Sequence, residues 1–234
     1  MVTGEAEGKP DTVYIELSAE ATAGNSADAL AQCRQKADAA VETIKALSIA
    51  NAEVLRDMYS FSSLAQTSPY GMSQPMSVPL GTKVSQIIRV KLKMAEQNSP
   101  EVLATKILWV LDAANKAGVG FKQPDSLQAQ MSGEGASRPV FYVLEDATQL
   151  QKQAIKNGIA RAKEVKASLT GSGVKAGKLL GVTYYLKGKD RVYYYGDQTD
   201  KVDVLNRNAV SSTSPEKVKV QCVLTNNYEV GEGQ

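Results

Sequence analysis

Histidine is absent from all 234 residues of the sequence. Its absence excludes Ser-His-Asp and Cys-His nucleophile systems, zinc sites with histidine ligands, and the commonest general base of enzymes. Cysteine is scarce, because the chain has only Cys33 and Cys222. Two cysteines are too few for a disulfide framework, and these two lie too far apart in the sequence to form a zinc knuckle.

Long hydrophobic runs and a strong net charge are also missing. The most apolar stretch, residues 102–114, is shorter than the roughly 18–20 residues of a membrane-spanning helix, which predicts no transmembrane segment. The 27 basic and 25 acidic residues leave a net charge of +2, which predicts no nucleic-acid partner. The first residues do not resemble a signal peptide, so the chain is either cytosolic or a mature form whose export signal has been removed.

Two blocks of regular periodicity are present instead. In the first block, apolar and polar side chains alternate over residues 12–21, which predicts a half-buried strand with Tyr14 and Ser18 on its polar face. Asn25 or Ser26 is suited to cap a helix whose apolar positions recur every three or four residues. The predicted elements are a strand over 12–21, a helix reaching Leu47, a strand over 53–61, a loop over 62–82 and a strand over 84–94.

A middle helix and a second block follow. Ser99-Pro100-Glu101 is a strong helix start. The long helix of the second block has an inward apolar stripe that includes Val165 and Leu169. The predicted elements are a helix over 100–118, a loop over 119–138, a strand over 140–144, a helix over 148–169, and strands over 180–186 and 218–224.

These elements predict an α+β fold of two β-α-β-β units, with helices packed on mainly antiparallel sheet and an extra middle helix. We expect one domain over 1–234, with pseudo-repeat halves at about 12–94 and 140–228 linked by the helix 100–118. The similarity of the two halves reflects either duplication of one structural unit or a chance similarity between common sequence patterns.

Two motifs that suggest ligand chemistry fail on their spacing. Residues 170–178 are rich in glycine and lysine, but five residues instead of four separate Gly171 from Gly177, and the segment leaves a helix instead of entering one. Asp197, Asp200 and Asp203 lack the alternate spacing of a calcium loop. We therefore predict no catalytic residues, no cofactor-binding residues and no metal site.

Tyrosine is enriched near the C-terminus. The ten tyrosines outnumber three phenylalanines and one tryptophan, and four of the tyrosines form a candidate ligand platform. The alternative is an ordinary strand surface or interface, where a tyrosine ring packs while its hydroxyl stays in water. The platform residues are Tyr184, Tyr193, Tyr194 and Tyr195.

The single tryptophan, Trp109, lies to one side of the inward stripe of the middle helix. On a helical wheel it groups with Val102, Lys106 and Ala113. This second strip meets either another subunit of a homo-oligomer or one of the long loops. Cys33 and Cys222 both occupy apolar faces, so we expect them to be buried, either as a disulfide or as two inert core thiols.

Four stretches occur in an order typical of one family. They are VTGEAEGKPD (residues 2–11), ALSI (46–49), LDAANKAG (111–118), and the long helix from Asp146 with GVKAGKLL (173–180). In this order the chain resembles the SIMPL-domain family, which typically opens with a V-x-G-x-G strand. Ala6 replaces the second of those glycines, and Ser48 replaces the usual glycine before Ile49. The loops over 119–138 and 188–216 look longer than is typical.

The resemblance implies an α+β fold, export to the bacterial periplasm or envelope, and self-association, and it supplies no catalytic residues. The resemblance therefore implies that the signal peptide has been removed from this chain. We predict a non-enzymatic exported envelope protein, a self-associating scaffold or stress-related interaction module. The alternative is a small-ligand-binding protein that uses the tyrosine-rich segment.

Overall fold

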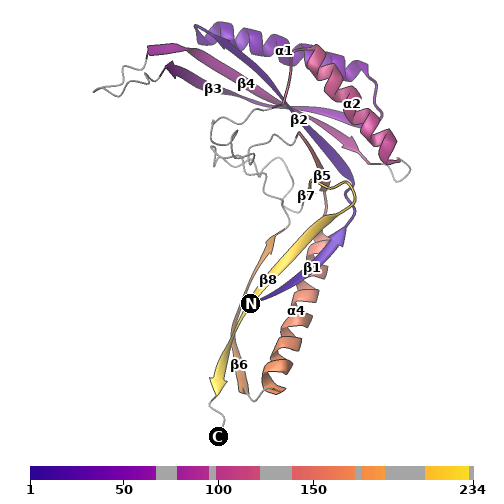
Figure 1. Ribbon diagram of the computed structural model, residues 1–234, viewed down its shortest axis with the longest axis vertical. Coiled ribbons are helices and arrows are strands. Elements are labelled where there is room, and N and C mark those ends of the chain that lie inside the picture. Colours follow the sequence, from indigo (N-terminus) through magenta and orange to yellow (C-terminus); the bar gives the residue numbers. More distant parts are fainter. Residues whose placement is uncertain (67–77, 95–98, 122–138, 172–174, 188–208, 232–234) are drawn as a thin grey trace. The chain divides into compact units, whose positions relative to one another are not determined.

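The computed structural model describes residues 1–66, 78–94, 99–121, 139–171, 175–187 and 209–231 (Figure 1). Helices and antiparallel strands are both abundant, which confirms the predicted α+β class. The chain divides into two compact units. We call them the middle unit, formed mainly by residues 13–140, and the terminal unit, formed by residues 1–12 and most of the chain after residue 140.

The middle unit is a sheet covered by two helices. Its strands lie in the order β3-β4-β2, and α1 packs on β4 and against α2 (Figure 1). The core between helices and sheet includes the fully buried Ile15, Ile88 and Val110. The elements are β2 (Thr12–Ala23), α1 (Ser26–Ala46), β3 (Ala52–Gln66), β4 (Val78–Lys93) and α2 (Pro100–Lys116).

Both helices begin at the predicted residues. The side chain of Asn25 accepts a hydrogen bond from the backbone N–H of Asp28 (2.8 Å), and Ser99 accepts one from Val102 in the same way. Each cap satisfies an N–H that the first helical turn leaves without a partner. The inward face of α1 then follows the predicted spacing of three and four residues. Its buried residues are Ala29, Cys33, Ala37, Ala40, Val41 and Ile44.

The turn after α1 contains Ser48, where the family resemblance implied a glycine. Ser48 has a φ of +49°, in the left-handed region that favours glycine. We expect Ser48→Gly to raise the unfolding free energy by about 0.5–1 kcal/mol, because relief of the left-handed strain exceeds the entropic cost of glycine. Urea unfolding measures the change, and Ala46→Gly, within the helix, should lower stability instead. A loss with Ser48→Gly would contradict the strained turn.

The prediction that one face of the strand over 12–21 is exposed is wrong. Tyr14 and Ser18 are buried like the apolar residues on the other face of β2. Long side chains of β4 reach across this face: Arg89 binds Glu16, and the Lys91 ammonium lies 6.0 Å from the centre of the Tyr14 ring. Alternation alone does not reveal such cover, because it comes from a neighbouring strand.

The predicted loop over 62–82 is shorter than expected. β3 and β4 stay paired antiparallel as far as Gln66 and Val78, so the strands occupy both ends of that segment. Backbone pairing supplies these hydrogen bonds whatever the side chains are, and the local Ser, Pro and Gly composition therefore misled the prediction.

The terminal unit joins both ends of the chain in one antiparallel sheet, β1-β8-β6, against which α4 packs. β5 pairs with β7. Periodicity did not predict β1 or β7; the family resemblance implied an opening strand. The elements are β1 (Val2–Gly8), β5 (Val140–Leu144), α4 (Thr148–Gly171), β6 (Lys175–Lys187), β7 (Val210–Ser212) and β8 (Val218–Gly231).

Small residues let β1 approach α4 closely. The inward face of β1 carries Gly4, Ala6 and Gly8, and a Cβ added to Gly4 would overlap the backbone of Ala154 and Gly158. The side chain of Asn157 donates a hydrogen bond to the Glu5 carbonyl (2.7 Å). The core beside this contact is formed by Ala6, Ala147, Ala154, Val210, Val218, Val220, Cys222 and Leu224.

The predicted inward stripe of the long helix is only half right. Ala154 and Gly158 are buried, but Val165 is 42% exposed and Leu169 is 41% exposed. α4 continues past the stretch that β1 covers, so the regular spacing of its apolar residues extends beyond the residues that are buried in the core. The predicted burial of Val165 and Leu169 is therefore wrong.

Each cysteine is a free thiol in its own core. Cys33 donates a hydrogen bond to the Ala19 carbonyl (3.3 Å), and Cys222 lies in the core of the terminal unit. Burial raises the pKa of both thiols. Of the two alternatives, the structure shows the free thiols. Among the described residues, no helix is both long and apolar enough to cross a membrane.

Candidate functional site

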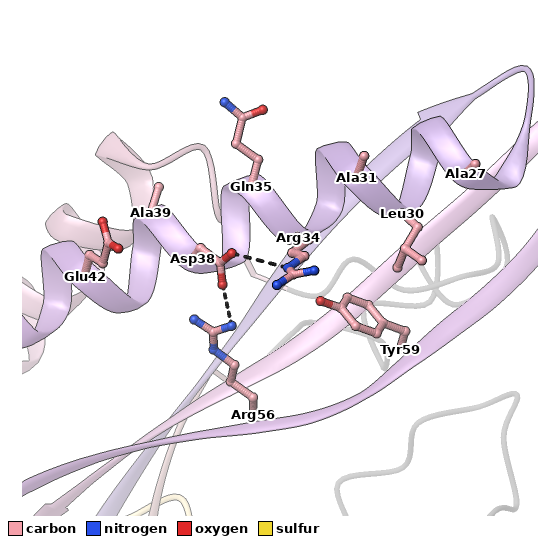
Figure 2. Close-up of a pocket in the computed structure, with 10 residues that line it drawn as sticks. All are labelled: Ala27, Leu30, Ala31, Arg34, Gln35, Asp38, Ala39, Glu42, Arg56 and Tyr59. Carbon is pink, nitrogen blue, oxygen red and sulfur yellow. Dashed lines mark hydrogen bonds and ion pairs between the residues drawn. The ribbon is translucent and has the colours of Figure 1, made fainter.

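A groove of about 960 Å³ lies between helix α1 and strand β3 in the middle unit (Figure 2). One helix face and the edge of the sheet form its walls. Leu30, Arg34 and Asp38 lie on the side of α1 that faces Arg56 and Tyr59 of β3. Ala31, Gln35 and Ala39 lie on the other side of the helix (Figure 2). The lining residues are Ala27, Leu30, Ala31, Arg34, Gln35, Asp38, Ala39, Glu42, Arg56 and Tyr59.

Ion pairs between the two walls neutralise much of the charge in this groove. Arg56 of β3 donates to the Asp38 carboxylate of α1 at 2.6 Å, and Arg34 approaches the same carboxylate at 3.7 Å (Figure 2). The two arginines balance Asp38 and Glu42. The groove therefore has neither the excess positive charge of an anion site nor a nucleophile beside a general base among its ten lining residues.

A β-bulge in β3 positions the charged residues around this groove. The register passes from Arg56 paired with Ile88 to Tyr59 paired with Gln86, so two residues of β3 oppose one of β4. The Gln86 side chain donates to the Asp57 carbonyl inside the bulge (2.8 Å), and its Oε1 atom has no hydrogen-bond partner among the described residues. The bulge places Arg56 and Tyr59 towards α1, while Asp57 reaches the Arg89 side chain.

The Arg89 side chain, which Asp57 reaches, is a buried cation that binds two carboxylates. Arg89 is 4% exposed and donates to Glu16 at 2.7 Å and to Asp57 at 2.5 Å. Burial by itself lowers the pKa of the Arg89 guanidinium, but the hydrogen bonds and charges of the two carboxylates outweigh it and the pKa lies above its usual value. The cluster joins β2, β3 and β4, which suits a structural role.

The candidate interface residues on the middle helix are partly at the surface. Trp109 is 51% exposed and Val102 is also exposed, while Lys106 is half-buried. Ala113 is 4% exposed and belongs to the core. Leu108, which the sequence analysis did not select, is exposed. Leu108 lies about 100° around the helix from Trp109, so we call Val102 and Trp109 alone the α2 strip.

The tyrosine platform lies largely outside the described residues. Tyr193, Tyr194 and Tyr195 are in the segment 188–208, and Tyr184 is described only as part of the backbone of β6. The loop over 122–138 is likewise outside. The ligand-platform alternative therefore stays a prediction.

Sequence reasoning missed both the groove and the Arg89 cluster. The groove depends on which helix face lies beside β3, which no periodicity specifies. The cluster left a signal: Arg89 stands between the apolar Ile88 and Val90, and Glu16 stands between Ile15 and Leu17. Opposite charges in the middle of two apolar strands indicate a cross-strand pair when the strands are neighbours.

The described residues contain no group of three or more acidic, cysteine or histidine side chains placed to hold a metal ion. Two surface features of the described residues remain as candidates for contact with another molecule, the α2 strip and the charge-balanced groove beside α1.

One family model matches residues 2–226, nearly the whole chain; it is described as SIMPL, a protein of unknown function (DUF541). No curated protein matches the chain. The match begins at the first residue of β1 and ends within β8, which continues to Gly231. The chain therefore belongs to the SIMPL family.

Proposed function

We propose that this SIMPL-family chain is a non-enzymatic, exported protein of the bacterial envelope that associates with copies of itself and acts as a scaffold or stress-related interaction module. Family membership and the α2 strip support the proposal. The observation that carries it is the exposure of Trp109 together with Val102 on the same side of α2.

The α2 strip has the composition of an interface centre. Val102 and Trp109 are seven residues apart, so they lie on one side of the helix about two turns from each other. Large aromatic side chains supply most of the energy of many protein interfaces. An isologous contact would bring the strip against the same strip of a second copy and remove the indole ring from water.

Self-association can be measured by light scattering. We expect the mass to exceed the 25.0 kDa of one chain as the protein concentration rises. Trp109→Glu should raise the midpoint of association, the concentration at which half of the chains are associated, by at least about tenfold, because it places a charge in an apolar contact. Because Trp109 is the only tryptophan, its emission should also move to shorter wavelength on association.

The matched control is Ala104→Glu, which adds the same charge at an exposed residue of α2 outside the strip. It should leave the midpoint unchanged. A mass of one chain at all concentrations, or an equal effect of both variants, would contradict association through α2.

Fractionation of bacteria that express the natural gene tests the envelope assignment, and recovery only from the cytosol would contradict it.

A further inference from the structure

β3 lies at one end of its sheet and has an open outer edge. It pairs with β4 along one side, and no other described strand pairs with its other side. Side chains along its second half are at the surface, since Met58 is 90% exposed and Phe61 is 56% exposed. The backbone N–H and C=O groups on this edge can therefore bind a further strand.

The second half of β3 lacks the features by which proteins usually prevent pairing between edge strands. Residues 58–63, Met-Tyr-Ser-Phe-Ser-Ser, contain no charged residue and no proline. The charged residues of β3 are Glu53, Arg56 and Asp57, and all precede this stretch. The β-bulge separates the two parts, because a bulge disrupts regular pairing where it occurs. The edge that suits a further strand therefore begins after the bulge.

Two aromatic side chains of this edge lie on the face towards α1. Tyr59 pairs with Gln86 and Phe61 pairs with Val84, and both of these β4 residues are buried. Residues that pair directly lie on the same face of a sheet. Figure 2 shows Leu30 of α1 pointing towards Tyr59. A strand added beside β3 would therefore place side chains at the open side of the groove between α1 and β3.

The distribution of charge along β3 favours a second copy of this chain as the added strand. If two β3 strands pair antiparallel about a two-fold axis at Ser60, Arg56 of one copy faces Ser63 of the other, because the two residues of the bulge occupy one position. The charged part of each strand then lies opposite the uncharged part of the other. An axis at Arg56 would instead bring two guanidinium groups directly opposite each other, which is unfavourable.

The same axis gives each aromatic ring a partner. Tyr59 of one copy lies opposite Phe61 of the other, and the two-fold axis repeats this pair. Aromatic side chains that face each other across two strands stabilise a sheet. The exposed Phe61 ring would leave water and lie beside Tyr59 of the second copy.

We propose that two copies of this chain pair through the outer edges of their β3 strands, antiparallel and about a two-fold axis at Ser60. Their two sheets join into one, and Tyr59 of each copy packs against Phe61 of the other. This contact goes beyond the proposed self-association through the α2 strip, because it lies on a different element and needs no contact of α2.

Cysteine cross-linking of the full chain tests the axis. The axis brings the two Ser60 residues opposite each other, and paired residues have Cα atoms about 4.5–5.5 Å apart, which suits a disulfide. Ser60→Cys should therefore form a covalent dimer on oxidation, which non-reducing electrophoresis measures. Cys33 and Cys222 are buried, so the unchanged chain gives the background.

Ser62→Cys is the matched control, because Ser62 is an exposed serine two residues further along the same face of β3. In the proposed register the two Ser62 residues lie four positions apart, or roughly 13 Å. That separation exceeds the limit of about 7 Å between Cα atoms for a disulfide. We expect Ser60→Cys to cross-link at least about tenfold faster than Ser62→Cys.

Further substitutions in the Ser60→Cys chain test the aromatic contact. Phe61→Lys should slow cross-linking at least about tenfold, because it places a charge on the edge. Ile159→Lys changes an apolar residue of α4 with similar exposure, 46%, and should leave the rate unchanged. Trp109→Glu should also leave it unchanged, because cross-linking traps β3 pairs whether or not α2 associates. Circular dichroism verifies that each variant is folded.

Four results would overturn the proposal. They are no covalent dimer of Ser60→Cys above the background, equal rates for Ser60→Cys and Ser62→Cys, equal effects of Phe61→Lys and Ile159→Lys, and loss of cross-linking with Trp109→Glu. The last result would show that the β3 edges meet only through association of α2. The light-scattering test of Trp109→Glu is separate, so either proposal can fail without the other.

Discussion

Gly4→Ala is expected to lower the unfolding free energy of the terminal unit by roughly 3 kcal/mol or more. The added Cβ would overlap the backbone nitrogen of Gly158 and the carbonyl oxygen of Ala154. Both are backbone atoms of a helix and cannot rotate away as a side chain can. The strand must therefore separate from α4, which also breaks the hydrogen bond from Asn157 to the Glu5 carbonyl.

The measurement must report on the terminal unit itself, because Trp109 belongs to the middle unit and the two units need not unfold together. Hydrogen exchange of β1 and α4 amides in native conditions, together with urea unfolding followed by circular dichroism, meets this need.

Two other glycines at the same contact provide matched controls. The atoms nearest to a Cβ on Gly8 would be side-chain atoms of Leu150 at 3.4 Å and Leu144 at 3.5 Å. A Cβ on Gly158 would meet chiefly the flexible end of Leu224 at 2.7 Å. Gly158→Ala also gains up to about 1 kcal/mol of helix propensity. Both should cost about 1 kcal/mol or less. If Gly8→Ala were as damaging as Gly4→Ala, the close backbone contact of Gly4 would not explain the loss.

Arg89→Met is the second substitution for which we expect a large effect, a loss of about 2–4 kcal/mol in the middle unit. Methionine keeps most of the buried volume but removes the cation that Glu16 and Asp57 share. Two carboxylates would then remain close together beneath the sheet. The loss is below that of a fully buried pair, because the Asp57 side chain is one-third exposed.

Arg56→Met is the control for this substitution. Arg56 lies on the neighbouring strand within one register position, but its ion pair with Asp38 is partly exposed to water. Exposed pairs contribute about 0–1 kcal/mol, so the loss should stay below 1 kcal/mol. Urea unfolding followed by Trp109 emission compares the two. Equal losses would show that burial of the Arg89 cluster does not matter for stability.

Local signals predicted the elements of this protein well. Asn25 and Ser99 cap their helices as expected, and the inward spacing of α1 is as predicted. These features succeed because capping and helical spacing depend on residues within a few positions of one another.

The candidate sites were less predictable. The wheel placed Trp109 and Val102 correctly outside the stripe, but it grouped Ala113 with them, although that residue is buried in the core. Val165 continues a correct helical period beyond the strand that covers it. In both cases the error comes from the neighbouring element, whose position no local pattern contains.

The sequence by itself determined the α+β class, the caps and most of the strands, together with the family to which the chain belongs. Only the tertiary structure decided that β1 pairs with β8 at the opposite end of the chain, that Arg89 is buried between two carboxylates, and where α4 loses its cover. The physical reason is range. Periodicity and capping arise from interactions along a few residues, whereas burial and charge pairing depend on segments that folding brings together from as far as 222 residues apart, as with Val2 and Leu224.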